Sequence, residues 1–286
     1  MDDTSLDVFR TVAEELSITR AAQRLGRAPS NVTTRVQQLE AELGAELFVR
    51  SGKRLSLSPQ GERFLGYAQR LLALTEEARQ SLQPDALSGL LRIGSMESTA
   101  ASRLPQPLAR LHARWPQVRL EVSTGPSAQL LERLRTQAID CALLALPPSQ
   151  EAADLAPSGI ELQPVFNEQL ELLLPAGHPP VSGPADLQVT TLAAFAAGCS
   201  YRAVAEHWLA AAGHRLDVQV VGSYHAMLAC VAAGHSACLM PLSVRALSPA
   251  LDLRSVPLFD LPTQLAWRSG YLTPALDALR SSLLQP

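Results

Sequence analysis

The strongest constraint on the fold lies in residues 1–44, where apolar side chains recur at helical spacing and glycine or proline separates the runs. The first run is Leu6, Phe9, Val12, Ala13 and Leu16. A second, shorter run has Thr19 as its expected N-cap and ends at Gly26. Pro29 suits the first turn of a third helix, which ends at Gly44. The apolar face of this third helix is Val32, Val36, Leu39 and Leu43. Three short helices with a tight turn between the second and third predict a helix-turn-helix.

The next segments predict a β-hairpin and then a long helix. Residues 45–50 and 54–59 have the pattern of short strands around a Ser51–Gly52 turn, and a hairpin directly after a helix-turn-helix is a wing. Ser58 is the expected cap of a helix that continues to Pro84. The narrow apolar stripe of this helix is Leu65, Ala68, Leu72, Thr75, Ala78 and Leu82. Since no segment nearby in the sequence is available to bury it, we expect the stripe to pair with a second copy of the chain, as in a short coiled coil.

The pattern changes after the linker-like segment 84–89, from helical stripes to strands that alternate with helices. Such alternation favours parallel βαβ units. The expected strands are 90–95, 118–124, 139–146, 170–175, 218–223 and 236–241, and the expected helices are 98–115, 127–137, 202–213, 224–234 and 273–284. The predicted domains are a mainly α winged helix-turn-helix (1–58), a dimerising linker helix and hinge (59–89), and an α/β domain (90–286) with one lobe at about 90–163 and 269–286 and a second at about 164–268. The two lobes leave a cleft between them, lined by the carboxyl ends of parallel strands.

Several motifs, in order and at consistent separations, resemble those of the LysR-type transcriptional regulators of bacteria. They are "AAQRL", "VTTRVQQLEAELGAELFVR" and "LSPQG" in the first part, then "LRIGS", "LPQPLARLHARWPQVRLEVSTG" and "VAAGHSACLMP". The resemblance covers essentially the whole chain. It implies a winged helix-turn-helix, a dimerising linker helix and a two-lobed effector domain of the periplasmic-binding-protein type. It also implies a regulator that binds promoter DNA as a dimer or tetramer and changes transcription when a small molecule binds. Ala28, Pro29 and Ser30 depart from the family's frequent Ser-Gln-Pro at the start of the recognition helix.

The charge distribution points to the same DNA-binding surface. The chain has a net charge of -3, yet its N-terminal basic residues gather on the second helix, the turn, the third helix and the wing. This partition is the one that neutralises phosphates on both sides of a major groove, while small hydroxyl and amide side chains on the third helix reach base edges. The predicted DNA-binding residues are Arg20, Arg27, Ser30, Asn31, Thr33, Thr34, Arg35, Gln37, Lys53 and Arg54.

The predicted effector site is the cleft. Ser98 and Thr99 follow a strand at the expected start of a helix, and Ser200 begins a helix in the second half. Free backbone N–H groups and the helix dipole favour an anion at such positions, so we expect a small anionic metabolite, a carboxylate, to bridge them. The resemblance also puts effector contacts at Ser98, Thr99, Thr124 and Ser200. The predicted effector-binding residues are Ser98, Thr99, Thr124, Cys199, Ser200 and Tyr201.

An alternative is a thiol-based redox or electrophile sensor of the same fold. Cys199 lies at an expected helix N-terminus near Arg202, and both features lower the pKa of a thiol.

An enzyme is disfavoured because the sequence has no nucleophile elbow, metal-binding motif or phosphate loop. A solute-binding protein would share the two lobes but would lack the helix-turn-helix. We therefore expect no cofactor, no metal and a cytoplasmic location without membrane association. The expected partners are promoter duplex, a small-molecule effector and further copies of the chain in a homodimer or homotetramer. RNA polymerase is a further candidate partner.

Overall fold

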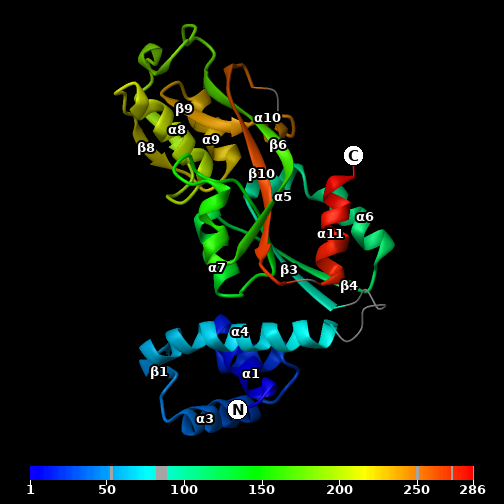
Figure 1. The fold of residues 1–286 in the computed structure, drawn as a ribbon. Helices are drawn as coiled ribbons and strands as arrows, with labels where there is room; N and C mark the ends of the chain where they lie inside the picture. The colour runs from blue at the N-terminus through cyan, green and yellow to red at the C-terminus, as the bar shows by residue number, and fades with distance from the viewer. Residues whose placement is uncertain (52–53, 82–88, 249–250, 272, 286) are drawn as a thin grey trace. The chain divides into compact units, whose positions relative to one another are not determined.

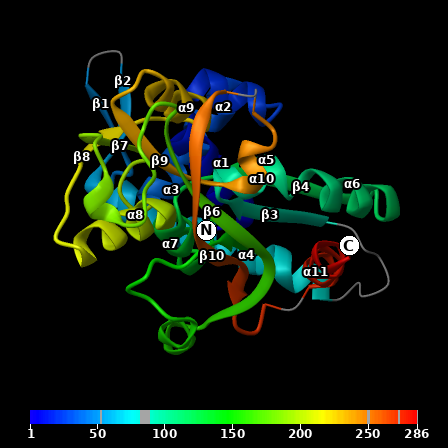
Figure 2. The same ribbon diagram turned by 90° about the horizontal axis from the view of Figure 1, so that it is seen from above.

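The computed structural model describes residues 1–51, 54–81, 89–248, 251–271 and 273–285 (Figures 1 and 2). The chain divides into two compact units, the first of residues 1–86 with 136–138 and the second of residues 87–135 and 139–286. Each unit has its own apolar core.

The first unit is a helix-turn-helix followed by a hairpin and a long helix. Its elements are α1 (Asp3–Glu15), α2 (Ile18–Arg24), α3 (Pro29–Leu43), the antiparallel pair β1 (Phe48–Ser51) and β2 (Arg54–Leu57), and α4 (Pro59–Ser81). The turn before α3 needs the left-handed conformation that Gly26 adopts, with φ of 63°. The predicted cap of α2 is wrong: Ser17 is the N-cap, and its hydroxyl accepts the N–H of Arg20. Thr19 lies inside the first turn, two residues after the capping position.

The first part of the predicted stripe of α4 is packed within the same chain, whereas Ala78 near its end is exposed. Ala68 is fully buried in a cluster with Phe9 of α1 and Leu39 of α3, and Leu65 and Leu72 pack against that cluster. The expectation that this stripe pairs with a second copy is therefore wrong for these residues, because α1, although distant in sequence from α4, covers it. Leu82 lies outside the described residues.

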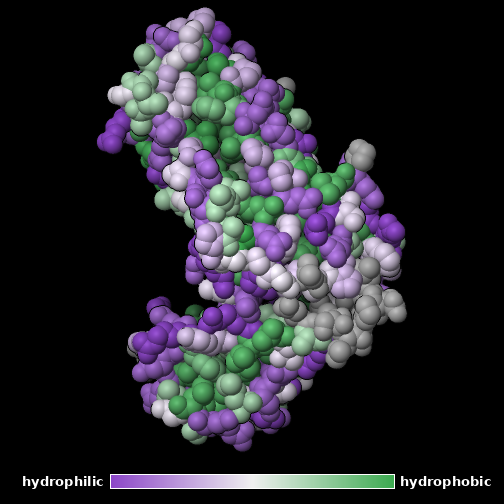
Figure 3. All heavy atoms as spheres, viewed as in Figure 1, coloured by the Kyte–Doolittle hydropathy of each residue, from purple (hydrophilic) through white to green (hydrophobic). Residues whose placement is uncertain are grey.

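A different face of α4 carries exposed apolar side chains. Tyr67, Leu71 and Leu74 are 58%, 39% and 57% exposed, and their spacing of four and three residues places them on one side of the helix. Figure 3 shows apolar residues at the surface over α4 and α1. We define Tyr67, Leu71 and Leu74 as the open face of α4.

We expect Gly61→Ala to destabilise the first unit by about 1–3 kcal/mol, because a Cβ at Gly61 would lie 2.0 Å from the carbonyl oxygen of Leu47. The first turn of α4 is held in this tight approach by Ser58, whose hydroxyl accepts the N–H of Gly61. Gly66→Ala is the matched control on the same helix, since a Cβ there meets nothing within 4 Å. Gly66→Ala should stabilise by about 0.5–1 kcal/mol. Hydrogen exchange of the α4 amides measures both, and equal protection in the two variants would contradict the expectation.

The second unit is a mixed eight-stranded sheet in the order β4-β3-β5-β10-β6-β9-β7-β8. Its strands are β3 (Gly89–Ser95), β4 (Val118–Thr124), β5 (Cys141–Leu144), β6 (Ile160–Pro175), β7 (Thr191–Ala194), β8 (Asp217–Val220), β9 (Ser236–Pro241) and β10 (Leu253–Arg268). The parallel set β4-β3-β5 forms the first lobe and the parallel set β9-β7-β8 forms the second. The long strands β6 and β10 are paired antiparallel to each other and run through both lobes (Figure 1).

Helices cover the two lobes. They are α5 (Glu97–Ser102), α6 (Pro105–Arg114), α7 (Ser127–Arg135), α8 (Ser200–Ala211), α9 (Tyr224–Ala232), α10 (Leu242–Arg245) and α11 (Pro274–Leu284). The chain returns to the first lobe at its end: Leu276 and Leu279 of α11 are buried in the same cluster as Ile93 of β3. The hydroxyl of Ser282 donates to the carbonyl of Pro107 on α6.

Several sequence expectations for the second unit differ from the structure. The single helix expected over 98–115 is two helices, because Pro105 supplies no N–H and a new helix begins there. The expected strands include neither β7 nor β10, and β6 begins at Ile160 rather than at residue 170. The four residues of β7, Thr-Leu-Ala-Ala, include two alanines, which are poor strand formers, and β10 contains two prolines, which cannot donate to a strand ladder. The predicted lobe boundary at 163/164 falls inside β6, and the one at 268/269 falls at the end of β10.

Candidate DNA-binding and effector sites

The exposed face of α3 gathers polar and basic side chains. Arg27, Asn31, Thr34, Arg35 and Gln38 line one shallow depression of the surface. Four of these residues were predicted, and Gln38 was missed although it lies one helical turn beyond Thr34 on the same face. Ser30 and Gln37 are also exposed.

Two other predicted DNA-binding residues have different surroundings. The hydroxyl of Thr33 donates to the carbonyl of Pro29, so this side chain is turned back onto its own helix. Arg54 lies exposed on β2 of the wing. Lys53 lies outside the described residues.

The basic surface of the helix-turn-helix is interleaved with acids, which the sequence pattern did not indicate. Arg20 pairs with Glu15 at 3.1 Å, and a carboxylate oxygen of Asp2 is 3.4 Å from Arg35. These pairs are exposed and so contribute little to stability. The arginines can therefore leave these carboxylates and bind DNA phosphates with little loss of free energy.

The start of α3 is open, as its sequence departure indicates. Ala28 is the N-cap and makes no side-chain cap, and Pro29 occupies the first turn. Pro29 has no N–H, and the N–H groups of Asn31 and Val32 donate to the carbonyl of Ala28, which leaves the N–H of Ser30 to face a partner such as a phosphate.

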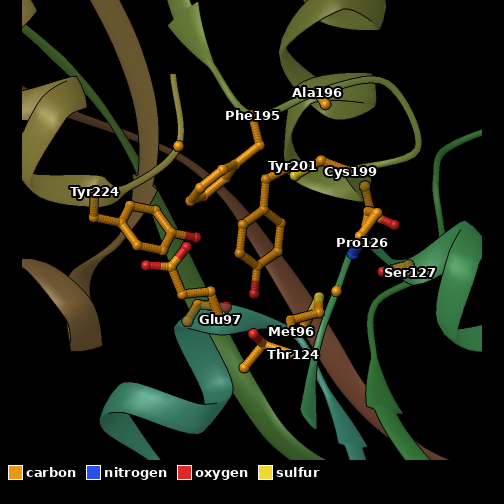
Figure 4. Close-up of a pocket in the computed structure, with 14 residues that line it drawn as sticks. Met96, Glu97, Thr124, Pro126, Ser127, Phe195, Ala196, Cys199, Tyr201 and Tyr224 are labelled. Carbon is orange, nitrogen blue, oxygen red and sulfur yellow. The ribbon is translucent and has the colours of Figure 1, made fainter. Parts of the chain in front are cut away.

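A cavity of about 200 Å³ lies between the lobes of the second unit (Figure 4). Five of the predicted effector residues lie along it: Ser98, Thr124, Cys199, Ser200 and Tyr201. Thr99 does not, because its side chain is turned into the protein and is 0% exposed. The structure thus brings together residues from the start of α5, the end of β4 and the start of α8.

Several buried hydroxyl groups at this site make no hydrogen bond of good geometry among the described residues. They are those of Ser98, Thr99 and Tyr201, together with Thr263 on the crossing strand β10. Ser98 and Thr263 nevertheless lie close enough to Tyr201 to act on its pKa, in the lowering direction, so these hydroxyls form one group. The hydroxyl of Ser200 is different, because it donates to the carbonyl of Ala145 at 2.6 Å. Buried polar groups are normally paired, so the unpaired hydroxyls that line the cavity, Ser98 and Tyr201, are suited to a ligand or to water.

Sequence reasoning missed the aromatic and acidic part of the cavity wall. Phe195 and Tyr224 meet edge to face, with ring centroids 5.0 Å apart, and both line the cavity with Glu97. Burial raises the pKa of the Glu97 carboxyl, an effect that the charge of His225 opposes. Phe195 directly follows β7, so missing that strand also hid this residue. Glu97 lies beside Ser98 in the sequence, but the hypothesis of an anionic ligand gave no role to a carboxylate at this site.

The prediction that Cys199 has a lowered pKa is wrong. Burial is the largest effect and raises the pKa of this thiol, and the opposing backbone N–H groups of Arg202 and Tyr201 do not outweigh it. Cys199 is the N-cap of α8 and is partly exposed in the cavity. Cys141 and Cys238 are fully buried in other clusters, and burial raises the pKa of Cys238 to about 12.

Among the described residues, no helix combines the length and apolar character that crossing a bilayer requires. Within the same part of the chain, no group of three or more His, Cys, Asp or Glu side chains is placed to hold a metal ion.

A winged helix-turn-helix followed by a long helix and a two-lobed domain with a cavity defines the class of ligand-responsive transcriptional regulators. Residues 4–62 match the family model of the bacterial regulatory helix-turn-helix proteins of the LysR family, and residues 84–285 match that of the LysR substrate-binding domain. The chain belongs to the LysR family of transcriptional regulators. Its matching families and relatives are regulators rather than enzymes.

Relatives and solved structures agree with this assignment. The transcriptional regulator GltR of Bacillus subtilis is 38% identical over 84% of this chain and 79% of its own length. The regulator YusT of the same species is 34% identical over 100% of this chain and 93% of its own. Full-length OxyR from Pseudomonas aeruginosa has a TM-score of 0.72 at 25% identity, covering 99% of this chain and 94% of that one. CbnR in complex with its target DNA has a TM-score of 0.68 at 23% identity, covering 99% of each chain, and so shows the shared fold.

Proposed function

We propose that two copies of the chain, pairing through α4, bind an inverted-repeat promoter site in the cytoplasm and that a small molecule in the cavity changes how they bind it. The observation that supports this most directly is the exposed polar face of α3, with its open N-terminus, in a chain that also carries a ligand-sized cavity. A dimer with twofold symmetry requires symmetric half-sites. A tetramer would engage two such sites, and contact with RNA polymerase stays a prediction.

The DNA-binding residues divide into two groups by what they reach. Asn31 and Thr34 lie on the exposed face of α3, where amide and hydroxyl groups reach base edges in the major groove. Arg54 lies on the wing, where a guanidinium reaches phosphate. The first group should determine which sequence is bound, and the second how tightly any sequence is bound.

We expect Arg54→Ala to weaken binding to all duplexes and to lower the slope of log affinity against log salt by about 1 for each copy bound, about 2 for the proposed dimer, because each copy loses one phosphate contact. Asn31→Ala with Thr34→Ala should instead change base preference, with about 1–3 kcal/mol at stake for each good bidentate base contact. Fluorescence anisotropy over a salt series measures the first effect, and selection from a randomised duplex library measures the second. A selection profile that the double variant leaves unchanged would contradict the assigned recognition face. Failure of the full chain to prefer any sequence would contradict the proposed function.

The open face of α4 supports association of two copies. Three apolar side chains that no other part of the described chain covers are a surface that a helix of a second copy can bury. The face lies on the helix that follows the wing directly, so pairing there would hold two recognition helices on one duplex.

Effector control requires two states of the cavity with different affinity for the ligand. The cavity wall is built from both lobes: Ser98 and Thr124 belong to the first, and Tyr201 and Tyr224 to the second. A ligand that touches both walls binds a closed arrangement better than an open one. Coupling of this kind is typically about 1–3 kcal/mol, enough to change promoter occupancy several-fold.

The thiol alternative is weaker because the thiolate is the reactive form of cysteine and burial raises the pKa of Cys199. Cys199→Ser separates the two accounts. Metabolite binding predicts that this variant keeps its response to the small molecule, whereas thiol sensing predicts that the response to peroxide or an electrophile is lost.

A further inference from the structure

We propose that the small molecule bound in this cavity carries a positively charged amine or quaternary ammonium group, held by Glu97 and the surrounding aromatic rings. The inference rests on the proposed ligand-binding role of the cavity and names the chemical class of the ligand. It replaces the carboxylate that the sequence favoured.

The charge of the cavity wall is the first support. Glu97 is the one acidic residue among the described residues that line the cavity, and no lysine, arginine or histidine lines it. Its carboxylate is half-buried and makes no direct ion pair with another described residue, although the charge of His225, which does not line the cavity, acts on it. A partly desolvated carboxylate without a directly bonded cation gains from a ligand that supplies one.

The aromatic residues are the second support. Phe195, Tyr201 and Tyr224 line the cavity around this carboxylate, and Figure 4 shows the Glu97 side chain directed toward the Tyr224 side of the group. The rings of Phe195 and Tyr224 are nearly perpendicular, with an interplanar angle of 88°, so the cavity wall presents two differently oriented rings at this point. The faces of such rings attract a cation within about 6 Å of the centroid, and more strongly when water is excluded.

The buried hydroxyls are the third support. Ser98 is 2% and Tyr201 is 3% exposed, and their neighbours in hydrogen-bonding range are other hydroxyls of the same group: those of Ser98 and Thr263 act to lower the pKa of Tyr201. Each oxygen has lone pairs that accept an N–H of a protonated amine. Together with the Glu97 carboxylate they supply acceptors on one side of the cavity and aromatic faces on the other.

An anion is disfavoured by the same geometry. The helix that was expected to bind it, α5, is only six residues long, and Glu97 already places a negative charge in its first turn. The arginine near the other predicted helix start is engaged elsewhere: Arg202 pairs with Glu206 at 2.8 Å and donates to the carbonyl of Phe195. A carboxylate in the cavity would therefore face Glu97 without a compensating cation.

The test is calorimetric titration of the full-length protein with two pairs of probes that differ in charge but little in shape. Phenethylammonium is compared with 3-phenylpropanoate, and choline with its uncharged carbon isostere 3,3-dimethylbutan-1-ol. We expect the cation of at least one pair to bind at least about tenfold more tightly than its counterpart. Equal or tighter binding of the anion and the neutral isostere, or no binding of either cation up to roughly millimolar concentration, overturns the proposal.

Variants assign the preference to the cavity. Glu97→Gln should remove the preference for the cation, and Phe195→Leu should weaken cation binding while the neutral isostere is less affected. Glu161→Gln is the matched control, because Glu161 is exposed on β6 away from the cavity wall. A cation preference that survives Glu97→Gln overturns the proposal. Duplex binding is measured in parallel: a chain that binds DNA but prefers anions refutes only the ligand class, whereas a chain that binds no specific duplex refutes the proposed function itself.

Discussion

Replacing both Leu71 and Leu74 with glutamate is expected to lower affinity for an inverted-repeat duplex by about 10²–10⁴-fold while the first unit stays folded. Both side chains are exposed, so the charges are tolerated in the monomer. In a dimer the same charges would have to be desolvated between two helices. Once the pairing is lost, each recognition helix binds its half-site alone, and the gain from binding a second half-site within one complex disappears.

Sedimentation velocity and duplex anisotropy on the same samples measure this effect. Leu71→Met with Leu74→Met is the matched control and should keep both dimer and affinity, because the face stays apolar. Leu72→Glu provides a contrast one residue away: Leu72 packs against the buried cluster of α1 and α4, so this change should unfold the unit rather than only dissociate it. Full affinity of the Leu71/Leu74 glutamate variant as a demonstrated monomer would refute the role of the open face.

The contrast between Leu71 and Leu72 shows how far the sequence carries the fold. Helical spacing predicted the helix-turn-helix and α4, and two short strand patterns around a turn predicted the wing, because these elements depend on local patterns and on caps such as Ser58. The partner of each face of α4 could not be predicted in the same way. Whether Ala68 meets α1 or a second copy depends on how α1 folds back on α4, and the local sequence does not carry that information.

The effector cavity shows the same limit. Loops after strands and the starts of helices correctly indicated Ser98, Thr124, Cys199, Ser200 and Tyr201, since parallel strands deliver such residues to one edge. Their chemistry was harder to predict. The wall is completed by Phe195, which follows the short strand β7, and by Tyr224, which begins α9; both belong to the second lobe. The pKa of Cys199 likewise depends on burial, which outweighs the helix start and the nearby arginine that the sequence displays.

A buried ion pair that the sequence did not indicate joins the two lobes. Glu168 on β6 is 1% exposed, and its carboxylate accepts two hydrogen bonds from Arg103, at 2.7 and 3.2 Å. Ser243 of α10 donates a third at 2.7 Å. Since Arg103 ends α5 of the first lobe and α10 belongs to the second, the Glu168 carboxylate on a crossing strand fixes one lobe against the other.

We expect Glu168→Ala to lower the free energy of unfolding of the second unit by about 3 kcal/mol. Removing one partner of a buried pair typically costs about 3–5 kcal/mol, because the other charge is left without compensation. The lower end applies here, since the Arg103 side chain is 36% exposed and water can partly solvate it. The hydroxyl of Ser243 would also lose its acceptor, although Ser102 remains 3.1 Å away.

Tryptophan fluorescence during denaturation of the full-length chain measures this effect in the right unit. The three tryptophans, Trp115, Trp208 and Trp267, all belong to the second unit, so their emission does not report unfolding of the first. Glu161→Ala on the same strand is the matched control and should change stability by no more than about 0.5 kcal/mol, since Glu161 is exposed. Arg103→Ala adds a second arm: removing both partners should cost less than the sum of the single changes, because the double variant leaves no unpaired charge. Strict additivity of the two changes would show that the pair contributes nothing as a pair, and that the lobes are held by their apolar cores alone.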